Sequence, residues 1–198
     1  MMSRTTPLKL MAILAHPDDE SLGVGGTLAT YAAEGIETYL VTATRGERGW
    51  VGEPNAYPGP RALGEIRERE LRAAAAVLGI RHLDILDYVD GELAQADPAE
   101  VTAKLVGIVR RARPDVVITF GPEGAYGHPD HIAISQLTTA ALVCAADPGY
   151  LDAVGGARPH RVAKLYHKIW TAEEQAVFQA AFGDIVMHVD GAERRPIG

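Results

Sequence analysis

The sequence contains a single cysteine, Cys144, among its 198 residues. One thiol excludes an internal disulfide and any zinc site built from several cysteines, and it fits a reducing compartment. An excess of positive charge is also missing, because 19 Lys and Arg stand against 26 Asp and Glu, for a formal net charge of −7. That balance excludes the basic surface of a typical nucleic-acid-binding protein. We therefore expect no nucleic acid among its partners.

Long hydrophobic runs are absent as well. No stretch approaches the roughly 20 apolar residues that a membrane-spanning helix requires. The apolar stretch 10–15 follows Arg4 and Lys9, but it is too short for the hydrophobic region of a signal peptide. It also continues into His-Pro-Asp-Asp-Glu and not into a cleavage site of small residues. The sequence predicts a cytoplasmic protein without a membrane span, and a buried strand at this point.

Hydrophobic residues make up 47% of the chain and charged residues 23%, as in an ordinary globular domain. Strands are predicted over Leu8–Ala15, Glu37–Thr44, His82–Leu86, Asp115–Phe120, Ala163–Trp170 and Ile185–Val189. Helices are predicted over Ser21–Glu34, Ala62–Leu78, Pro98–Arg111, Asp130–Ala145 and Thr171–Phe182. The alternation predicts an α/β fold of the Rossmann-like type, a mostly parallel sheet with helices on both faces. No linker divides the chain, so residues 1–198 are expected to form one domain, and the abrupt end at 194–198 leaves room for a further C-terminal segment.

Polar side chains follow the first four predicted strands. In an open α/β sheet, ligands bind beyond the carboxyl ends of the strands. The polar residues at these ends are His16, Asp18, Asp19 and Glu20, then Arg45, Glu47 and Arg48, then Asp87 and Asp90, then Glu123, Tyr126, His128, Asp130 and His131. The candidate catalytic side chains are thus expected along one rim of the sheet.

The tripeptide His-Pro-Asp occurs twice, at 16–18 and at 128–130. A given tripeptide of this kind is expected on the order of 0.01 times in such a chain. His16 and Asp19 are three residues apart, as are His128 and His131, so each pair can share one face of a helical turn. Imidazoles together with a carboxylate suit zinc and leave a fourth position for water. One such residue after a strand is more often a helix cap, but two matching motifs favour a metal site.

The glycines in Gly23-Val24-Gly25-Gly26 offer a nucleotide-binding alternative. A dinucleotide-binding fingerprint has its first glycine directly after the strand. Here a polar segment separates the strand that ends at Ala15 from Gly23. We expect these small residues instead to let the following helix lie close to the sheet.

The motifs resemble those of the PIG-L/LmbE-like zinc-dependent N-deacetylases. These are Rossmann-like enzymes that remove acetyl groups from N-acetylglucosamine-type substrates. The matching segments are Ala-His-Pro-Asp-Asp-Glu at 15–20, Gly-Glu-x-Gly at 46–49, Arg-x-x-Glu at 67–70, Asp-Gly at 90–91 and Gly-His-Pro-Asp-His at 127–131. The resemblance covers about residues 8 to 135, in the same order along the chain.

The resemblance implies the roles of ten residues. Its metal ligands are His16, Asp19 and His131, its catalytic residues are Asp18, His128, Asp130 and Tyr126, and its substrate-binding residues are Arg67, Glu47 and Asp90. Asp18 would be the general base, and His128 the electrostatic or acid partner, oriented by Asp130. Tyr126 would reach the oxyanion. The metal would be one Zn²⁺ per chain, with another divalent metal as the alternative.

The expected reaction is hydrolysis of the N-acetyl group of an N-acetylglucosamine-type or related amide, which releases acetate and a free amine. Three alternatives stay open: an amidase for a non-acetyl amide conjugate, a sugar-binding module without activity, and a nucleotide-binding module. A homo-oligomer is compatible with the sequence. The loops 46–60 and 147–160 offer Trp50, Tyr57 and Tyr150 for stacking on a small-molecule amino sugar. For Arg67, the alternative is an exposed helical charge paired with a glutamate.

Overall fold

The computed structural model describes residues 7–150, 157–183, 187–189 and 192–194. Its centre is a five-stranded sheet in the order β3-β2-β1-β4-β5, in which every neighbouring pair is parallel. The strands are β1 (Lys9–Leu14), β2 (Glu37–Thr44), β3 (His82–Tyr88), β4 (Val116–Phe120) and β5 (Lys164–Lys168). The predicted Rossmann-like α/β fold is confirmed.

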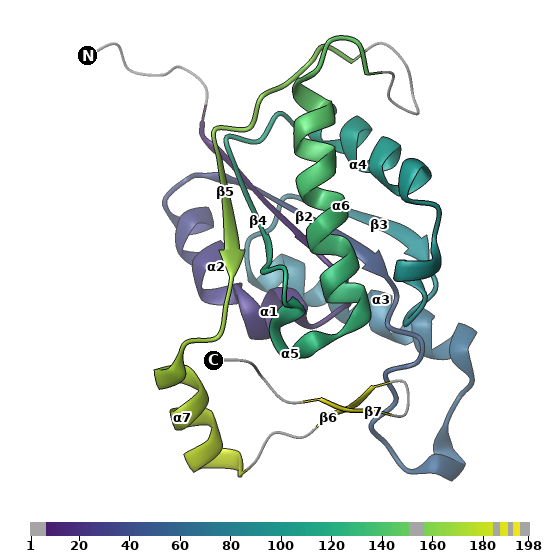
Figure 1. The fold of residues 1–198 in the computed structure, drawn as a ribbon. Coiled ribbons are helices and arrows are strands. Elements are labelled where there is room, and N and C mark those ends of the chain that lie inside the picture. Colours follow the sequence, from purple (N-terminus) through teal and green to yellow (C-terminus); the bar gives the residue numbers. More distant parts are fainter. Residues whose placement is uncertain (1–6, 151–156, 184–186, 190–191, 195–198) are drawn as a thin grey trace.

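Helices cover both faces of this sheet, with α4 and α6 on one side and α2 and α3 on the other (Figure 1). The helices are α1 (Asp19–Gly23), α2 (Gly25–Ala33), α3 (Pro60–Val77), α4 (Pro98–Ala112), α5 (Gly124–Gly127), α6 (Pro129–Ala146) and α7 (Ala172–Phe182). Short 3₁₀ turns lie at Pro54–Ala56 and Leu93–Gln95. Because both faces are covered, every residue from Leu10 to Ala15 is at most 4% exposed. None of the described helices is both long and apolar enough to cross a membrane.

Local sequence signals set the ends of several helices. Asp97 caps α4 by accepting the Ala99 N–H at 2.9 Å, and Pro98 occupies the first helical position. Gly35 and Gly79 end the segments after α2 and α3 with φ values of 84° and 72°, which glycine adopts at little cost. These helix ends lie where the sequence predicts them.

The prediction of one helix over Ser21–Glu34 is wrong, because the chain turns at Val24 between α1 and α2. A Cβ on Gly25 would lie 3.2 Å from the main-chain oxygen of Glu20 and 3.5 Å from the Leu78 side chain. Gly25 therefore permits a close approach to α1 and to the end of α3. Toward the sheet, a Cβ on Gly23 would lie 3.9 Å from the Lys168 side chain of β5.

The prediction of a last strand over Ile185–Val189 also needs correction. Residues 187–189 form β6 (Met187–Val189), which pairs antiparallel with β7 (Ala192–Arg194) in a separate two-stranded sheet. Residues 185 and 186 lie outside the described residues. Helix α7 and this hairpin lie beyond the layers of the central sheet (Figure 1).

The strand order brings the two His-Pro-Asp motifs together. β1 pairs directly with β4, and successive strands are added outward from this pair in opposite directions. Loops at such a switch point diverge to opposite faces and leave a crevice at the carboxyl ends of the strands. The fold thus places residues 16–20 and 123–131 at one edge.

Candidate metal centre

Donor atoms of three side chains meet at the carboxyl ends of β1 and β4. His16 Nδ1 lies 3.2 Å from His131 Nε2 and 3.6 Å from Asp19 Oδ2. His131 Nε2 lies 3.4 Å from Asp19 Oδ1, and all three side chains are at most 10% exposed. The structure therefore brings the three predicted metal ligands together.

These separations fit a metal ion. In a tetrahedral zinc site with bonds of about 2.0–2.1 Å, neighbouring ligand atoms lie about 3.4 Å apart. The two ring nitrogens are 3.2 Å apart, His131 Nε2 lies 3.4 Å from Asp19 Oδ1, and His16 Nδ1 lies 3.6 Å from the other oxygen, Oδ2, so the separations lie around that value. His128 also places a ring nitrogen within 4.8 Å of those of His16 and His131. Two imidazoles and a carboxylate are a donor set that suits zinc and related divalent metals.

Two further carboxylates hold the far side of the His16 ring. His16 Nε2 lies 3.1 Å from Asp130 Oδ2 and 3.1 Å from Asp90 Oδ1. A proton on Nε2 satisfies these acceptors, which leaves the Nδ1 lone pair directed toward the other two donors. Asp90 and Asp130 thus orient the ring of a predicted metal ligand from behind.

The Asp130 carboxylate differs from its expected role. It accepts the N–H groups of Gly91 at 2.8 Å and Leu93 at 3.1 Å, in addition to contacting His16. Its connection to His128 runs through the main chain, because the Asp130 N–H donates to His128 Nδ1 at 3.1 Å. His128 is oriented by the Asp130 amide, while the carboxylate orients His16.

Negative charge surrounds the centre. Burial lowers the pKa of His16, but its hydrogen bonds to Asp130 and Asp90 and the charge of Asp19 outweigh this and raise the pKa to about 10. Burial raises the pKa of Asp19, but His131 and His16 outweigh it and lower the pKa to about 2. Such a cluster of carboxylates attracts a cation.

Asp18 and Asp19 have different surroundings although they are neighbours. The Asp19 side chain is 10% exposed, and its Oδ2 accepts the main-chain N–H groups of Ala15 and His16. The Asp18 side chain is 51% exposed and accepts a hydrogen bond from Arg67 Nη2 at 2.7 Å. Burial and the charge of Asp19 raise the pKa of Asp18, against the effect of Arg67. Asp19 is fixed on the main chain, and Asp18 faces open space.

His128 and Tyr126 complete the predicted catalytic group. Since His128 Nδ1 accepts the Asp130 N–H, its Nε2 carries the proton of the neutral ring. Burial and the neighbouring charges of His16 and His131 lower the pKa of His128 to about 4. Burial and nearby carboxylates raise the pKa of the Tyr126 phenol, whose ring lies 5.9 Å from that of His128. Both side chains are therefore hydrogen-bond donors at neutral pH.

A pocket of about 640 Å³ opens over these residues. Its lining includes Asp18, Arg67, Glu70, Trp50, Tyr126 and His128. A larger hollow, of about 880 Å³, lies between α2 and β5, but none of the ten predicted site residues lines it. The smaller pocket is the one that coincides with the donor atoms.

The family model for PIG-L, described as GlcNAc-PI de-N-acetylase, matches residues 11–142. This match covers most of the described α/β core and both His-Pro-Asp motifs. The chain belongs to the PIG-L family.

Proteins of known name and structure agree with this assignment. The 1D-myo-inositol 2-acetamido-2-deoxy-alpha-D-glucopyranoside deacetylase of Kineococcus radiotolerans is 42% identical over 81% of this chain and 51% of its own length. The conserved protein TT1542 of Thermus thermophilus is 38% identical, with a TM-score of 0.65 over 80% of this chain and 64% of that one. The N,N'-diacetylchitobiose deacetylase of Pyrococcus horikoshii is 31% identical, with a TM-score of 0.65 over 72% and 52%. The chain spans about half the length of the first of these relatives.

Two PIG-L motif residues with an expected substrate role connect neighbouring loops. Glu47 Oε1 accepts the Asp90 N–H at 2.9 Å, and Asp90 Oδ2 accepts the Arg48 N–H at 3.0 Å. These reciprocal bonds join the loops after β2 and β3. Asp90 also contacts His16 and is only 7% exposed, although it reaches the pocket wall.

Arg67 of the PIG-L Arg-x-x-Glu element is not an exposed charge paired with a glutamate. Its side chain is 14% exposed, and it donates to the main-chain oxygens of Pro17 and Gly46 as well as to Asp18. A Cβ on Gly46 or Gly49 would lie within 3.0 Å of the Arg67 guanidinium. The two glycines of Gly-Glu-x-Gly therefore make room for this side chain.

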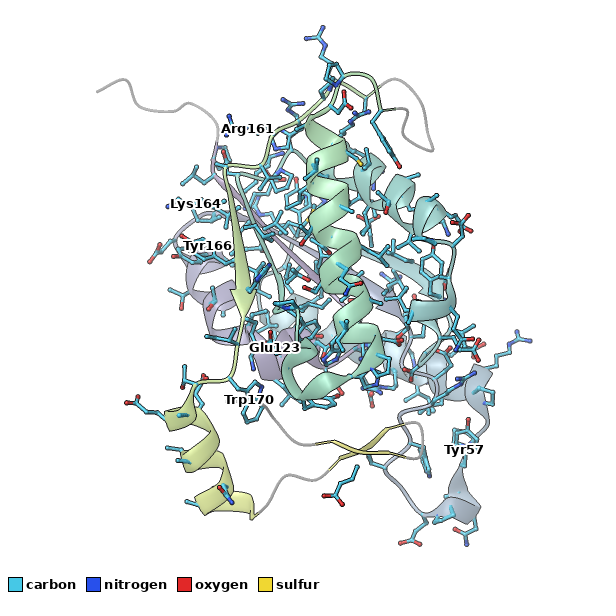
Figure 2. The ribbon with its side chains drawn as sticks, viewed as in Figure 1. Tyr57, Glu123, Arg161, Lys164, Tyr166 and Trp170 are labelled. Atoms are coloured by element: carbon cyan, nitrogen blue, oxygen red, sulfur yellow. The ribbon has the colours of Figure 1, made fainter. Side chains whose placement is uncertain are left out.

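The three aromatic residues proposed for sugar stacking lie in different surroundings in the structure. Trp50 lines the pocket. Tyr57 projects from the loop between β2 and α3 (Figure 2), with its ring 6.1 Å from that of Trp50. Tyr150 packs against the core, and its carbonyl accepts a hydrogen bond from Arg110 at 2.9 Å. Trp50 is the one that can face a ligand in the pocket.

Sequence reasoning missed Phe120, the last residue of β4. Its ring stacks on His131 with centroids 3.9 Å apart and planes 6° from parallel. The sequence does contain a signal for this contact, because an aromatic residue ends the strand that precedes the second histidine motif. Packing of this kind restricts the orientation of a metal-ligating ring.

Proposed function

We propose that the protein is a metal-dependent N-deacetylase for an N-acetylglucosamine-type substrate. The observation that carries the proposal is the convergence of His16 Nδ1, His131 Nε2 and the Asp19 carboxylate within 3.2–3.6 Å beside the half-exposed Asp18. The names of two relatives support the substrate class, because each describes deacetylation of an N-acetylated amino sugar.

His16, Asp19 and His131 would hold a divalent metal, which when bound would lower the pKa of a water molecule and polarise the amide carbonyl. The Asp18 carboxylate lines the pocket and accepts the proton of the attacking water. Asp19 is held by two main-chain N–H groups and serves as ligand. Two adjacent aspartates thereby divide the roles of ligand and base.

Charge that develops on the carbonyl oxygen requires preorganised donors. Tyr126 and His128 both line the pocket, and each carries a proton for this purpose. The leaving nitrogen also requires a proton, which Asp18 or His128 supplies from the pocket wall. The products are acetate and a free amine.

The sugar ring occupies the part of the pocket between Trp50 and Arg67. The indole face stacks on the apolar face of a pyranose, and the pocket volume of about 640 Å³ suits a small glycoside. The inositol glycoside named for the Kineococcus relative is our preferred substrate.

The test is release of acetate from a panel of amides by the zinc-loaded protein. The panel contains N-acetylglucosamine, its inositol glycoside, N,N'-diacetylchitobiose and N-benzoylglucosamine. We expect acetate and free amine from at least one acetylated sugar, and loss of both with His131→Ala. His82→Ala is the matched control, because that imidazole is half exposed on β3 and remote from the pocket.

Two outcomes would contradict the proposal. Cleavage of the benzoyl amide alone would indicate an amidase for non-acetyl conjugates. Binding of the sugars without release of any acid would indicate a sugar-binding module.

A further inference from the structure

Asp18 has a backbone conformation that an aspartate rarely adopts. Its φ is 108° and its ψ is −31°, outside the left-handed helical region as well as the common ones. A non-glycine residue keeps such a conformation only when its surroundings fix it, and these residues gather at functional sites. The contacts that fix Asp18 therefore bear on the presentation of its carboxylate.

Glu20 makes the contact with the Asp18 amide. Glu20 Oε2 accepts the Asp18 N–H at 3.0 Å, and Glu20 Oε1 accepts the Ser21 hydroxyl at 2.6 Å. The Glu20 residue is only 1% exposed. A buried carboxylate is costly unless its oxygens are hydrogen-bonded, and both oxygens here are used within the same short segment.

The other polar groups of Asp18 are held as well. Its carbonyl accepts the N–H groups of Ser21 and Leu22, each at 2.9 Å. Arg67 donates to the Pro17 carbonyl and to the Asp18 carboxylate. Glu20 is the buried side chain that acts on the Asp18 N–H, and therefore on the φ angle that turns the carboxylate toward the pocket.

Glu20 itself lies outside the pocket and outside the candidate metal centre. It is not among the residues that line the pocket, nor among the clustered donor atoms. The resemblance to the family also gave it no role, although it ends the Ala-His-Pro-Asp-Asp-Glu segment.

We propose that Glu20 is a positioning residue for Asp18. Its buried carboxylate holds the Asp18 N–H and thereby fixes the strained turn that presents the base to the attacking water. The inference rests on the proposed function, since it assigns Asp18 as base. A displacement of a reacting group by about 1 Å can lower a rate by about 100-fold, so a loosened turn is expected to act on kcat.

Three substitutions of Glu20 separate acceptor position from charge and volume. Glu20→Gln keeps an oxygen at the same reach, Glu20→Asp keeps the charge but withdraws it by one methylene, and Glu20→Met keeps the volume without a comparable acceptor. We expect Glu20→Gln to keep at least a third of the wild-type kcat. Glu20→Asp and Glu20→Met should lose about 10- to 100-fold in kcat. KM and zinc content should stay within about twofold of wild type in all three.

The Asp18→Asn background provides the deciding comparison. If Glu20 acts through the Asp18 carboxylate, Glu20→Asp should lower the residual activity of Asp18→Asn by less than about threefold, because the two changes affect one unit. Additive losses, or loss of zinc from Glu20→Asp, would show a general structural role and overturn the proposal. If Glu20→Met does not fold, Glu20→Gln and Glu20→Asp still distinguish a positioning role from a general structural role.

Failure of this inference differs from failure of the proposed function. Full kcat in Glu20→Asp together with an inactive Asp18→Asn would refute the positioning role alone. Full activity in Asp18→Asn would refute the assignment of Asp18 as base, and with it the role of Glu20.

Discussion

Two adjacent aspartates, Asp18 and Asp19, have identical side chains and different environments. The main-chain N–H groups of Ala15 and His16 fix the Asp19 carboxylate beside the ring nitrogens. The side chain of Asp18 is 51% exposed, against 10% for Asp19. The backbone differs as well, because Asp18 has a φ of 108°, and its carboxylate accepts a hydrogen bond from Arg67 and lines the pocket.

Substitution of each aspartate by asparagine should separate ligand from base. We expect Asp18→Asn to keep most of its metal and to lose activity by about two to four orders of magnitude, the range of a lost general base. Asp19→Asn should bind zinc more weakly, because an amide oxygen is a poorer ligand than a carboxylate. Metal content by elemental analysis and acetate release, each measured with and without excess zinc, check both variants.

The opposite pattern would reverse the assignment. Metal loss in Asp18→Asn with retention in Asp19→Asn would make Asp18 the ligand. Partial recovery of Asp19→Asn in excess zinc, without recovery of Asp18→Asn, is the result that agrees with the geometry.

Residue spacing predicted this pair only in part. The spacing of three positions from His16 to Asp19 indicated a shared face, and His16 Nδ1 does lie 3.6 Å from Asp19 Oδ2. Asp90 and Asp130 were predicted as site residues, but their contact with the far side of His16 was not, because it depends on how the sheet places their loops. Local periodicity carries no information about contacts between residues 16 and 130.

At the scale of elements, one side chain of α3 joins the loops that follow β1 and β2. Arg67 donates to Pro17 and Asp18 in the first loop and to Gly46 in the second. The side chain is 14% exposed, so these bonds are formed mostly out of water. The arrangement connects helix packing with the geometry of the pocket.

Removal of this connection should affect both stability and catalysis. We expect Arg67→Ala to lower the free energy of unfolding by about 1–3 kcal/mol, because buried carbonyls lose their donor. The value of kcat/KM should fall at least several-fold while zinc content stays normal. Urea denaturation and initial rates of acetate release measure the two effects.

Arg61 on the same helix is the matched control. Its side chain is 94% exposed and pairs with Glu65 one turn away. Arg61→Ala should change the free energy of unfolding by less than about 0.5 kcal/mol and leave kcat/KM unchanged. Equal effects of the two substitutions would contradict the assigned role of Arg67.

Helix and strand positions were predictable where the signal is local. Caps such as Asp97 and stops such as Gly79 mark helix ends by their own conformational preferences. The turn at Val24 was not predictable in this way, because it depends on the approach of Gly25 to Glu20 and Leu78. The latter contact joins residues more than fifty positions apart, which no local pattern encodes.

At the scale of the whole molecule, the topology decides where chemistry can occur. Alternation of strands and helices predicted a parallel sheet, and the order β3-β2-β1-β4-β5 places the two histidine motifs side by side. The end of the chain was less predictable, because β6 and β7 pair with each other and not with the central sheet. A short apolar strand contains no signal for which edge it will join.

The same topology leads to a prediction about thermal stability. Asp19, Asp90 and Asp130 are each at most 10% exposed in their side chains, and they converge on the ends of β1 and β4. A cation bound there interacts with the folded chain and not with the unfolded one, so it stabilises the fold by mass action. At a free zinc concentration of about 100 times Kd, the gain is about 2.7 kcal/mol.

We therefore expect removal of the metal to lower the melting temperature. For a domain of this size, 1 kcal/mol corresponds to about 2–4 °C, so EDTA treatment should lower Tm by about 5–10 °C, and added Zn²⁺ should restore it. Differential scanning calorimetry of the wild type and of His131→Ala provides the comparison. The variant lacks a proposed ligand whose Nε2 lies 3.2 Å from His16 Nδ1, so its Tm should respond to neither EDTA nor zinc at the same concentrations. An equal shift in wild type and variant would place the metal elsewhere on the molecule, since a site built on His131 cannot stabilise a chain that lacks that imidazole.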